Sequence, residues 1–346
     1  MTTQMAAAGA VTRTLTPTSM LNGYTASVLV YAFERVGLWT LLAAPGGRSV
    51  DELAADLSLD RARVAAMVDA ARKLDILEVD ADGRVRLRDL GRELLVEKSR
   101  FIVAVGGYGD VFHRLAELAQ RTLRFGVDVR RDDVQVARGC AQTLVPEVVE
   151  AFERALDSVE FRIIADIGCA DASRLVQACR RHPHIRAIGI DVSPEACDLA
   201  RCRIAEAGLS DRIDVVCADV LDIVADPARY TDRLDGVDMV TSSFMLHHLI
   251  AHPAHGPRIM RLIQGAFPSA RHFLIADHVQ APAGADADRE AVFSLEFELL
   301  HSFMDVPTPT RQSYDRIFAA AGLRVQQVHR FGHPDELLFL LATEPA

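Results

Sequence analysis

The stretch RIIADIGCADAS, residues 162–173, decides the fold that this sequence predicts. It opens as an apolar run with Asp166 near its end, which predicts a buried strand that closes on an acidic side chain. Gly168 follows at a tight turn, where the lack of a Cβ lets the backbone approach a ligand closely. Ala170 and Ala172 stand where a glycine-rich turn would have glycines. The stretch therefore predicts the first strand and turn of a doubly wound sheet.

Strand and helix patterns alternate through the rest of the chain. Strands are predicted over residues 162–170, 185–193, 213–220, 236–246 and 271–279, and helices over 173–182, 194–208 and 258–267. This alternation is the signature of βαβ units on a largely parallel sheet. We predict a Rossmann-like α/β catalytic domain over residues 156–346, with ligands outside the carboxyl ends of its strands.

Three acidic residues end three successive predicted strands. Asp166 is the first, Asp191 follows it by 25 residues, and Asp219 ends the third strand in CADVLD. The separation of the first two suits a carboxylate that accepts hydrogen bonds from ribose hydroxyls, and Asp219 stands where the exocyclic amine of a base would donate. Together they predict a nucleoside-containing cofactor, and Val220 and Ser242 complete the predicted cofactor-binding set.

The first 100 residues predict a different domain. Residues 1–16 are rich in Thr and Ala and predict a disordered N-terminus. A long helix over 19–42, a capping box SVDE at 49–52, a second helix over 58–74 and a hairpin turned at ADG (81–83) follow. Helices followed by a two-stranded wing indicate a winged-helix-like domain over 17–100, and a helical connector over 101–155 lines the active site.

This winged-helix-like pattern admits two functions. DNA binding is one, but residues 58–74 mix arginines with aspartates and are otherwise largely apolar. The first long helix is apolar on more than one face, which favours packing of two subunits into a homodimer.

Net charge and cysteine spacing limit the expected binding partners and the expected cellular compartment. The net charge of −10 argues against nucleic acid, because phosphate binding needs an excess of Lys and Arg. The six cysteines lack paired spacing and predict reduced thiols in a cytoplasmic protein. Neither a signal peptide nor a membrane-spanning run is evident, so no membrane partner is expected.

The acidic trio resembles the S-adenosylmethionine site of class I methyltransferases. Because the N-terminal domain also matches, the resemblance extends to the small-molecule methyltransferases in which that domain builds an intertwined dimer. It implies that Asp166 and Gly168 line the methionine end, Asp191 holds the ribose and Asp219 contacts adenine. A nicotinamide dinucleotide is the alternative cofactor, but its pyrophosphate needs the glycines that Ala170 and Ala172 replace.

A histidine pair, His247–His248, follows the fourth predicted strand in SSFMLHHLIAHPAH (242–255). Small-molecule O-methyltransferases resemble one another in a base histidine at the position of His247, followed by Asp-Trp, which His248 and Leu249 replace here. His301 lies 54 residues further on, in a predicted helix. The sequence also resembles the α-keto acid C-methyltransferases of peptide-antibiotic pathways, typified by phenylpyruvate C3-methyltransferase. That resemblance implies a non-haem metal, iron or zinc, on His247 (or His248) and His301.

Two functions follow from this site. The first is metal-dependent methylation of C3 of a 2-oxo acid, for the supply of β-methyl amino acids to peptide natural products. The alternative is O-methyl transfer to a small molecule with His247 as general base. Asp277 and His278, which end the next strand, are expected behind the histidines, and Arg131 either pairs with a substrate carboxylate or belongs to a solvated charge run.

Overall fold

The computed structural model describes residues 16–142, 146–251, 258–280, 295–306, 308–331 and 336–343. The predicted disordered segment 1–16 thus lies, except for its last residue, outside the described residues. The chain divides into two compact units, with the boundary between Phe101 and Ile102. Each unit is described by itself below.

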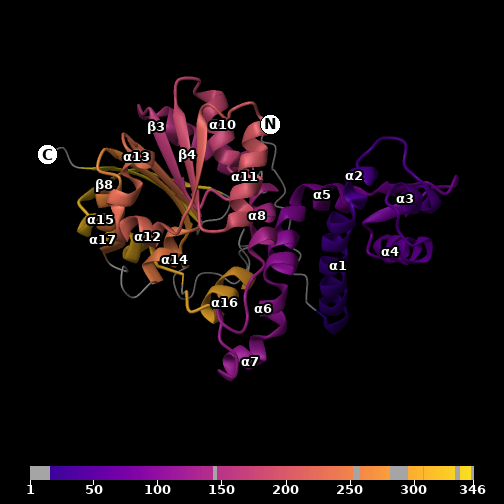
Figure 1. Ribbon diagram of the computed structural model, residues 1–346. Helices are drawn as coiled ribbons and strands as arrows, with labels where there is room; N and C mark the ends of the chain where they lie inside the picture. Colours follow the sequence, from indigo (N-terminus) through magenta and orange to yellow (C-terminus); the bar gives the residue numbers. More distant parts are fainter. Residues whose placement is uncertain are drawn as a thin grey trace, which may run out of the picture. The chain divides into compact units, whose positions relative to one another are not determined.

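The first unit consists of helices and one small hairpin (Figure 1). Its elements are α1 (Pro17–Val36), α2 (Leu38–Leu42), α3 (Val50–Asp56), α4 (Arg61–Lys73), β1 (Leu77–Val79), β2 (Val85–Leu87) and α5 (Asp89–Phe101). The hairpin is antiparallel, with Val79 opposite Val85. The predicted capping box is present, since Ser49 and Glu52 each bond the other's backbone amide. None of the described helices is long and apolar enough to cross a bilayer.

The predicted single helix over 19–42 is wrong in one respect. Gly37 adopts φ +83°, a left-handed conformation that ends α1, and α2 starts again at Leu38. Glycine accepts this conformation without the steric cost that a Cβ would bring. The break folds Trp39 back, so that its indole N–H donates to the Val30 carbonyl at 2.9 Å and its ring meets Phe33 edge-on. The apolar run therefore forms two helices joined by a bend in the hydrophobic core, and not one continuous helix.

The second unit begins with the connector. Its elements are a π-helix over Ile102–Gly107, α6 (Gly109–His113), α7 (Leu115–Ala119), α8 (Asp133–Gln142) and α9 (Pro146–Asp157). These residues are helical apart from the irregular stretch between α7 and α8. Tyr108, Val111 and Val129 form a small core with Leu300 and Met304 from much later in the chain. This core attaches the connector to the segment that carries His301.

A seven-stranded sheet in the order β5-β4-β3-β6-β7-β9-β8 forms the centre of the second unit. Its strands are β3 (Ile163–Ile167), β4 (Arg186–Asp191), β5 (Ile213–Cys217), β6 (Met239–Ser243), β7 (His272–His278), β8 (Leu323–Arg330) and β9 (Glu336–Thr343). Strands β3 to β7 are parallel, whereas β9 lies antiparallel between β7 and β8. The predicted fold class, a Rossmann-like α/β domain after a mainly helical N-terminal domain, is confirmed.

Helices cover both faces of this sheet (Figure 1). The helices of this unit that follow α9 are α10 (Ser173–Arg181), α11 (Pro194–Glu206), α12 (Val220–Ala225), α13 (Thr231–Leu234), α14 (Leu246–Ala251), α15 (Ile259–Ala266), α16 (Leu295–Phe303) and α17 (Arg311–Ala320). Successive strand residues face opposite sides, so Ile164 packs with α9, α10 and α11 while Ala165 packs with α12, α15 and α17. The order of strands reverses between β3 and β6. This switch point is where doubly wound sheets bind ligands.

Candidate active site

Asp166 lies at the carboxyl end of β3, beside the switch point. It is 4% exposed, and its Oδ1 accepts a hydrogen bond from the Thr241 hydroxyl of β6 at 2.7 Å. Burial raises the pKa of Asp166 to about 6, although the Thr241 bond and the positive charge of Arg174 oppose that rise. A buried carboxylate with this pKa is poised to ionise when a cation binds beside it.

The turn after β3 has an unusual backbone. Gly168 has φ +78°, and a Cβ there would come within 3.1 Å of the Met245 side chain. Ala170 and Ala172 also have positive φ, at +49° and +59°. Left-handed backbone costs an L-residue roughly 1–2 kcal/mol. The loop thus keeps the path of a glycine-rich turn even though two of its positions carry alanine.

Asp191 and Asp219 follow the next two strands of the sheet. Asp191 ends β4, and its carboxylate accepts the backbone N–H of Ala170 at 3.0 Å and of Ser193 at 2.9 Å. Asp219 caps α12, accepting the N–H of Leu221 at 2.8 Å. Burial raises the pKa of Asp191. The two carboxylates thus lie along the same edge of the sheet as Asp166.

The other two predicted cofactor residues, Val220 and Ser242, are both buried. Val220 packs in the hydrophobic core on the α12 face of the sheet. Ser242 is 3% exposed, and its hydroxyl has no hydrogen-bond partner among the described residues. Val220 is therefore placed to support the edge that carries Asp219 by packing.

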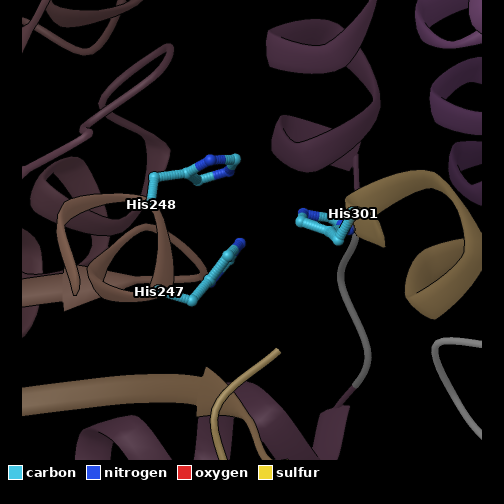
Figure 2. Close-up of side chains that lie close together, drawn as sticks. All are labelled: His247, His248 and His301. Carbon is cyan, nitrogen blue, oxygen red and sulfur yellow. The ribbon is translucent and has the colours of Figure 1, made fainter. Parts of the chain in front are cut away.

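His247, His248 and His301 form one cluster. The first two lie on α14, directly after β6, and His301 lies on α16, so their rings face one another across the end of the sheet (Figure 2). One side-chain nitrogen of each lies within 4.8 Å of the others. Ring centroids are 4.2 Å apart for His247 and His248, and 4.8 Å for His247 and His301. The chain brings together the three histidines that were singled out from the sequence.

Hydrogen bonds fix the orientation of two of these rings. The Asp277 carboxylate lies 2.7 Å from His247 Nδ1 and also accepts the His247 backbone N–H at 3.0 Å. His301 Nδ1 lies 2.7 Å from the Phe297 carbonyl oxygen. Because both partners are acceptors, each Nδ1 carries the proton and each Nε2 is left as a lone-pair donor. His247 Nε2 is buried and has no protein partner among the described residues.

His248 and His301 are uncharged at neutral pH. Burial, with the nearby His247 and Arg131, lowers the pKa of His248 well below its usual value. Burial and His247 lower the pKa of His301 to about 3. His248 and His301 therefore offer neutral imidazole nitrogens, which suit a proton acceptor and a metal ligand equally.

Arg131 lies near this cluster. Its Nε pairs with Asp133 at 2.6 Å, and its Nη1 donates to the Tyr108 hydroxyl at 3.1 Å. Its positive charge lowers the pKa of both His248 and His301. Arg130, its neighbour, is exposed. Of the two arginines in the charge run, Arg131 is the partly buried one.

Sequence reasoning missed three residues that shape the site. Thr241 donates to Asp166, Tyr108 accepts from Arg131, and the buried Tyr314 hydroxyl donates to the His278 backbone carbonyl at 3.4 Å. Each acts through a partner far away in the sequence, so no local motif marks it. Asp277 was expected behind the histidines, and the alternation of β7 places it there.

Comparison with known proteins decides the class of enzyme. Residues 164–264 match the methyltransferase domain family. A protein of Aspergillus campestris named methyltransferase ungE' is 28% identical over 319 residues, which cover 90% of this chain and 91% of that protein. The protein is an S-adenosylmethionine-dependent methyltransferase.

Other comparisons concern the fold and the acceptor. Human N-acetylserotonin methyltransferase in complex with S-adenosylmethionine superimposes with a TM-score of 0.70 at 17% identity, covering 95% of this chain and 96% of that one. Mitomycin 7-O-methyltransferase gives a TM-score of 0.65 at 17% identity, covering 94% and 96%. A 3-hydroxy-5-methyl-1-naphthoate 3-O-methyltransferase of Streptomyces sahachiroi is 33% identical over 123 residues, 36% of this chain and 32% of that one.

These names bear on the two functions expected for the methyltransferase. Two of these similar proteins are named as O-methyltransferases, and no C-methyltransferase is named among them. They support S-adenosylmethionine as the cofactor and give no support to a metal ion.

Proposed function

We propose that the enzyme transfers the methyl group of S-adenosylmethionine to a hydroxyl of a small organic acid. The observation that carries this proposal is the buried His247–Asp277 pair, which leaves His247 Nε2 as a free proton acceptor at the end of β6. A His–Asp pair of this kind holds the base in the correct tautomer and stabilises the imidazolium that forms.

The proposed reaction needs only the residues of this site. His247 Nε2 takes the proton of the acceptor hydroxyl while the oxygen attacks the sulfonium methyl carbon. The methyl–sulfur bond breaks, and S-adenosylhomocysteine leaves as a neutral thioether. Arg131, whose positive charge lowers the pKa of His248 and His301, is the proposed partner of the acceptor's carboxylate. An aromatic hydroxy acid, the acceptor class in the name of the Streptomyces relative, meets both requirements.

The residues at the carboxyl edge of the sheet are the proposed contacts of the cofactor. Asp166 meets the ammonium group of the methionine end, Gly168 lets the backbone approach it, Asp191 accepts the ribose hydroxyls and Asp219 accepts the adenine amine. Asp191 is held rigidly by two backbone amides, which prepares it to accept further hydrogen bonds.

The cofactor contact of Asp166 predicts a pH dependence. In the free protein this carboxyl has a pKa of about 6, because it is buried. A cofactor ammonium binds the ionised form, so the affinity for S-adenosylhomocysteine is expected to be constant above the pKa and to fall as the pH drops through about 6. Calorimetric titration at a series of pH values measures this. Asp166→Asn is expected to remove the pH step, and a pH-independent affinity of the wild type contradicts the assignment.

A second function is favoured by the three-histidine cluster. A single base histidine suffices for O-methyl transfer, whereas three imidazoles with nitrogens within 4.8 Å of one another make a donor set for iron or zinc. His247 and His301 each have Nδ1 fixed by an acceptor, the arrangement that orients histidine ligands. The residues therefore fit a metal ion, with His247, His248 and His301 as its ligands.

Such an ion would supply Lewis acidity that makes C3 of a chelating 2-oxo acid more acidic. Arg131 would again face the carboxylate end of the acceptor. This is the metal-dependent C3 methylation expected from the sequence, and it would place the enzyme in the supply of β-methyl amino acids.

One experiment separates the two functions. The purified protein is analysed for metal, and its rate of methyl transfer to a panel of aromatic hydroxy acids and 2-oxo acids is measured before and after chelation. O-methyl transfer predicts turnover of hydroxy acids that survives chelation. Stoichiometric metal, with turnover of 2-oxo acids that chelation abolishes, supports the second function instead.

We also propose a homodimer built by the first unit. Met20, Leu21 and Val28 of α1 are 62%, 70% and 39% exposed, an unusual apolar content for a surface helix. Sedimentation is expected to give twice the chain mass of 37.9 kDa. Leu21→Glu with Val28→Glu is expected to give a monomer, and Arg63→Glu on the exposed face of α4 serves as the control. A wild-type monomer contradicts the proposal.

A further inference from the structure

Two cysteines, Cys197 and Cys217, lie beside Asp191 and take no part in the proposed reaction. Cys197 lies near the start of α11, and Cys217 is the last residue of β5. The Cys197 thiol donates to the Asp191 backbone carbonyl at 3.5 Å. The amide of Ala218, the residue after Cys217, donates to the same oxygen at 2.9 Å. This shared oxygen places the Cys197 sulfur next to the backbone that follows Cys217.

The side chains of the two cysteines belong to the same face of the sheet. Cys217 is the register partner of Asp191 in the parallel pair of β4 and β5. Alternate residues of a strand share a face, and Val215 packs in the same hydrophobic core as Cys197. Cys217 follows Val215 by two residues, so it faces α11, which packs on β5. The two thiols therefore lie on one side of the sheet, next to one carbonyl group.

The two thiols differ in their access to solvent. Cys197 is fully buried, whereas Cys217 is exposed at the edge of the sheet. Burial, with the neighbouring Cys217 thiol, raises the pKa of Cys197 to about 12, so this thiol is protonated at neutral pH and reacts poorly by itself. Cys217 is the thiol that a dissolved oxidant reaches. An accessible thiol next to a second cysteine is the arrangement in which an oxidised sulfur is captured as a disulfide.

We propose that Cys197 and Cys217 form a site of reversible oxidation, at which a peroxide converts the two thiols into a disulfide that weakens cofactor binding. One peroxide oxygen is transferred to the Cys217 sulfur, which gives a sulfenic acid and one water. The Cys197 sulfur then attacks the Cys217 sulfur, the sulfur–oxygen bond breaks, and the hydroxide leaves with the Cys197 proton as a second water. The sulfurs lose two electrons, which the peroxide accepts, and a thiol reductant restores both cysteines.

The effect of the disulfide on binding rests on the proposed cofactor contacts. A Cys197 sulfur bonded to Cys217 has lost its proton, so it no longer donates to the Asp191 carbonyl. A disulfide also holds its two Cβ atoms about 3.5–4.5 Å apart, which ties the end of β5 to α11. Asp219, the proposed partner of the adenine amine, follows Cys217 by two residues. Oxidation is therefore expected to displace both proposed contacts and to weaken S-adenosylhomocysteine binding about tenfold.

The first readout of the test is the disulfide itself. The full-length wild type, Cys217→Ser and Cys202→Ser are treated with hydrogen peroxide, the remaining thiols are alkylated, and the proteolytic peptides are analysed by mass spectrometry. A cross-linked Cys197–Cys217 peptide is expected from the wild type and not from Cys217→Ser. Cys202, an exposed cysteine on the same helix, is the matched control, and Cys202→Ser is expected to behave as the wild type does.

The second readout is calorimetric titration of S-adenosylhomocysteine into the same samples. Peroxide is expected to weaken binding about tenfold in the wild type, and dithiothreitol is expected to restore it. Cys217→Ser is expected to bind equally well before and after treatment.

Two results would overturn the proposal. If the treated wild type yields no Cys197–Cys217 peptide and Cys217 is recovered alkylated or as a sulfinic acid, Cys197 is not its partner. If the cross-linked peptide forms and the affinity does not change, the disulfide does not affect the cofactor site. Neither result depends on whether the cofactor contacts themselves are correct, because Asp191→Ala in the reduced protein tests those contacts separately.

Discussion

Replacing His247 by alanine is expected to lower kcat by about 10²- to 10⁴-fold, the range for loss of a general base. Its Nε2 is the buried acceptor at the end of β6, and Asp277 holds the opposite nitrogen at 2.7 Å. Initial rates with saturating S-adenosylmethionine and an aromatic hydroxy acid measure the effect. The affinity for S-adenosylhomocysteine is expected to change by less than about twofold, because His247 acts on the acceptor.

Two variants control this prediction. His184→Ala removes an exposed histidine from the same unit and is expected to leave kcat unchanged. Asp277→Asn presents an amide donor to His247 Nδ1 and favours the wrong tautomer, so its kcat is expected to fall without loss of cofactor affinity. A His247→Ala enzyme with near wild-type kcat would show that another group takes the proton.

Replacing Asp191 by alanine is expected to weaken the binding of S-adenosylhomocysteine by about 100-fold, the loss of two charge-assisted hydrogen bonds. The carboxylate ends β4 and is fixed by the amides of Ala170 and Ser193. Calorimetry with the purified variant gives the affinity. Asp191→Asn retains one acceptor oxygen and is expected to lose about tenfold.

A folding defect has to be separated from lost binding in this experiment. Ala170 has a left-handed backbone conformation, and its amide donates to Asp191. Asp191→Ala therefore also removes a hydrogen bond that holds the loop of Ala170. Thermal unfolding of each variant without ligand shows whether the second unit remains intact. If Asp191→Ala binds S-adenosylhomocysteine as tightly as the wild type does, Asp191 does not hold the ribose.

The fold was predictable from the sequence because its pattern is local. Apolar runs that end on Asp166 and Asp191, with helical segments between them, define βαβ units without further information. The position of β9 between β7 and β8 was not predictable, because antiparallel insertion at a sheet edge leaves no periodic signal. Gly37 was a helix-ending signal, but the apolar residues on both sides of it favoured a continuous helix.

The candidate site was predictable only in part. His247 and His301 were paired by resemblance to known enzymes, and the structure places their rings 4.8 Å apart. The bond from Thr241 to Asp166 and the packing of Arg174 on Phe152 depend on contacts between distant segments. The left-handed backbone of Ala170 and Ala172 was also not predictable, because alanine does not favour it.

The central claim is that the methyl group goes to an acceptor oxygen deprotonated at His247. The most direct test is to turn over an acceptor that carries both groups, such as an aromatic 2-oxo acid with a phenolic hydroxyl, using S-adenosylmethionine labelled with carbon-13 at the methyl. Carbon NMR of the product distinguishes a methyl on oxygen from a methyl on carbon. The account predicts an O-methyl product from both untreated and chelator-treated enzyme. A methyl group on C3, formed only before chelation, would contradict it and establish the metal-dependent function in its place.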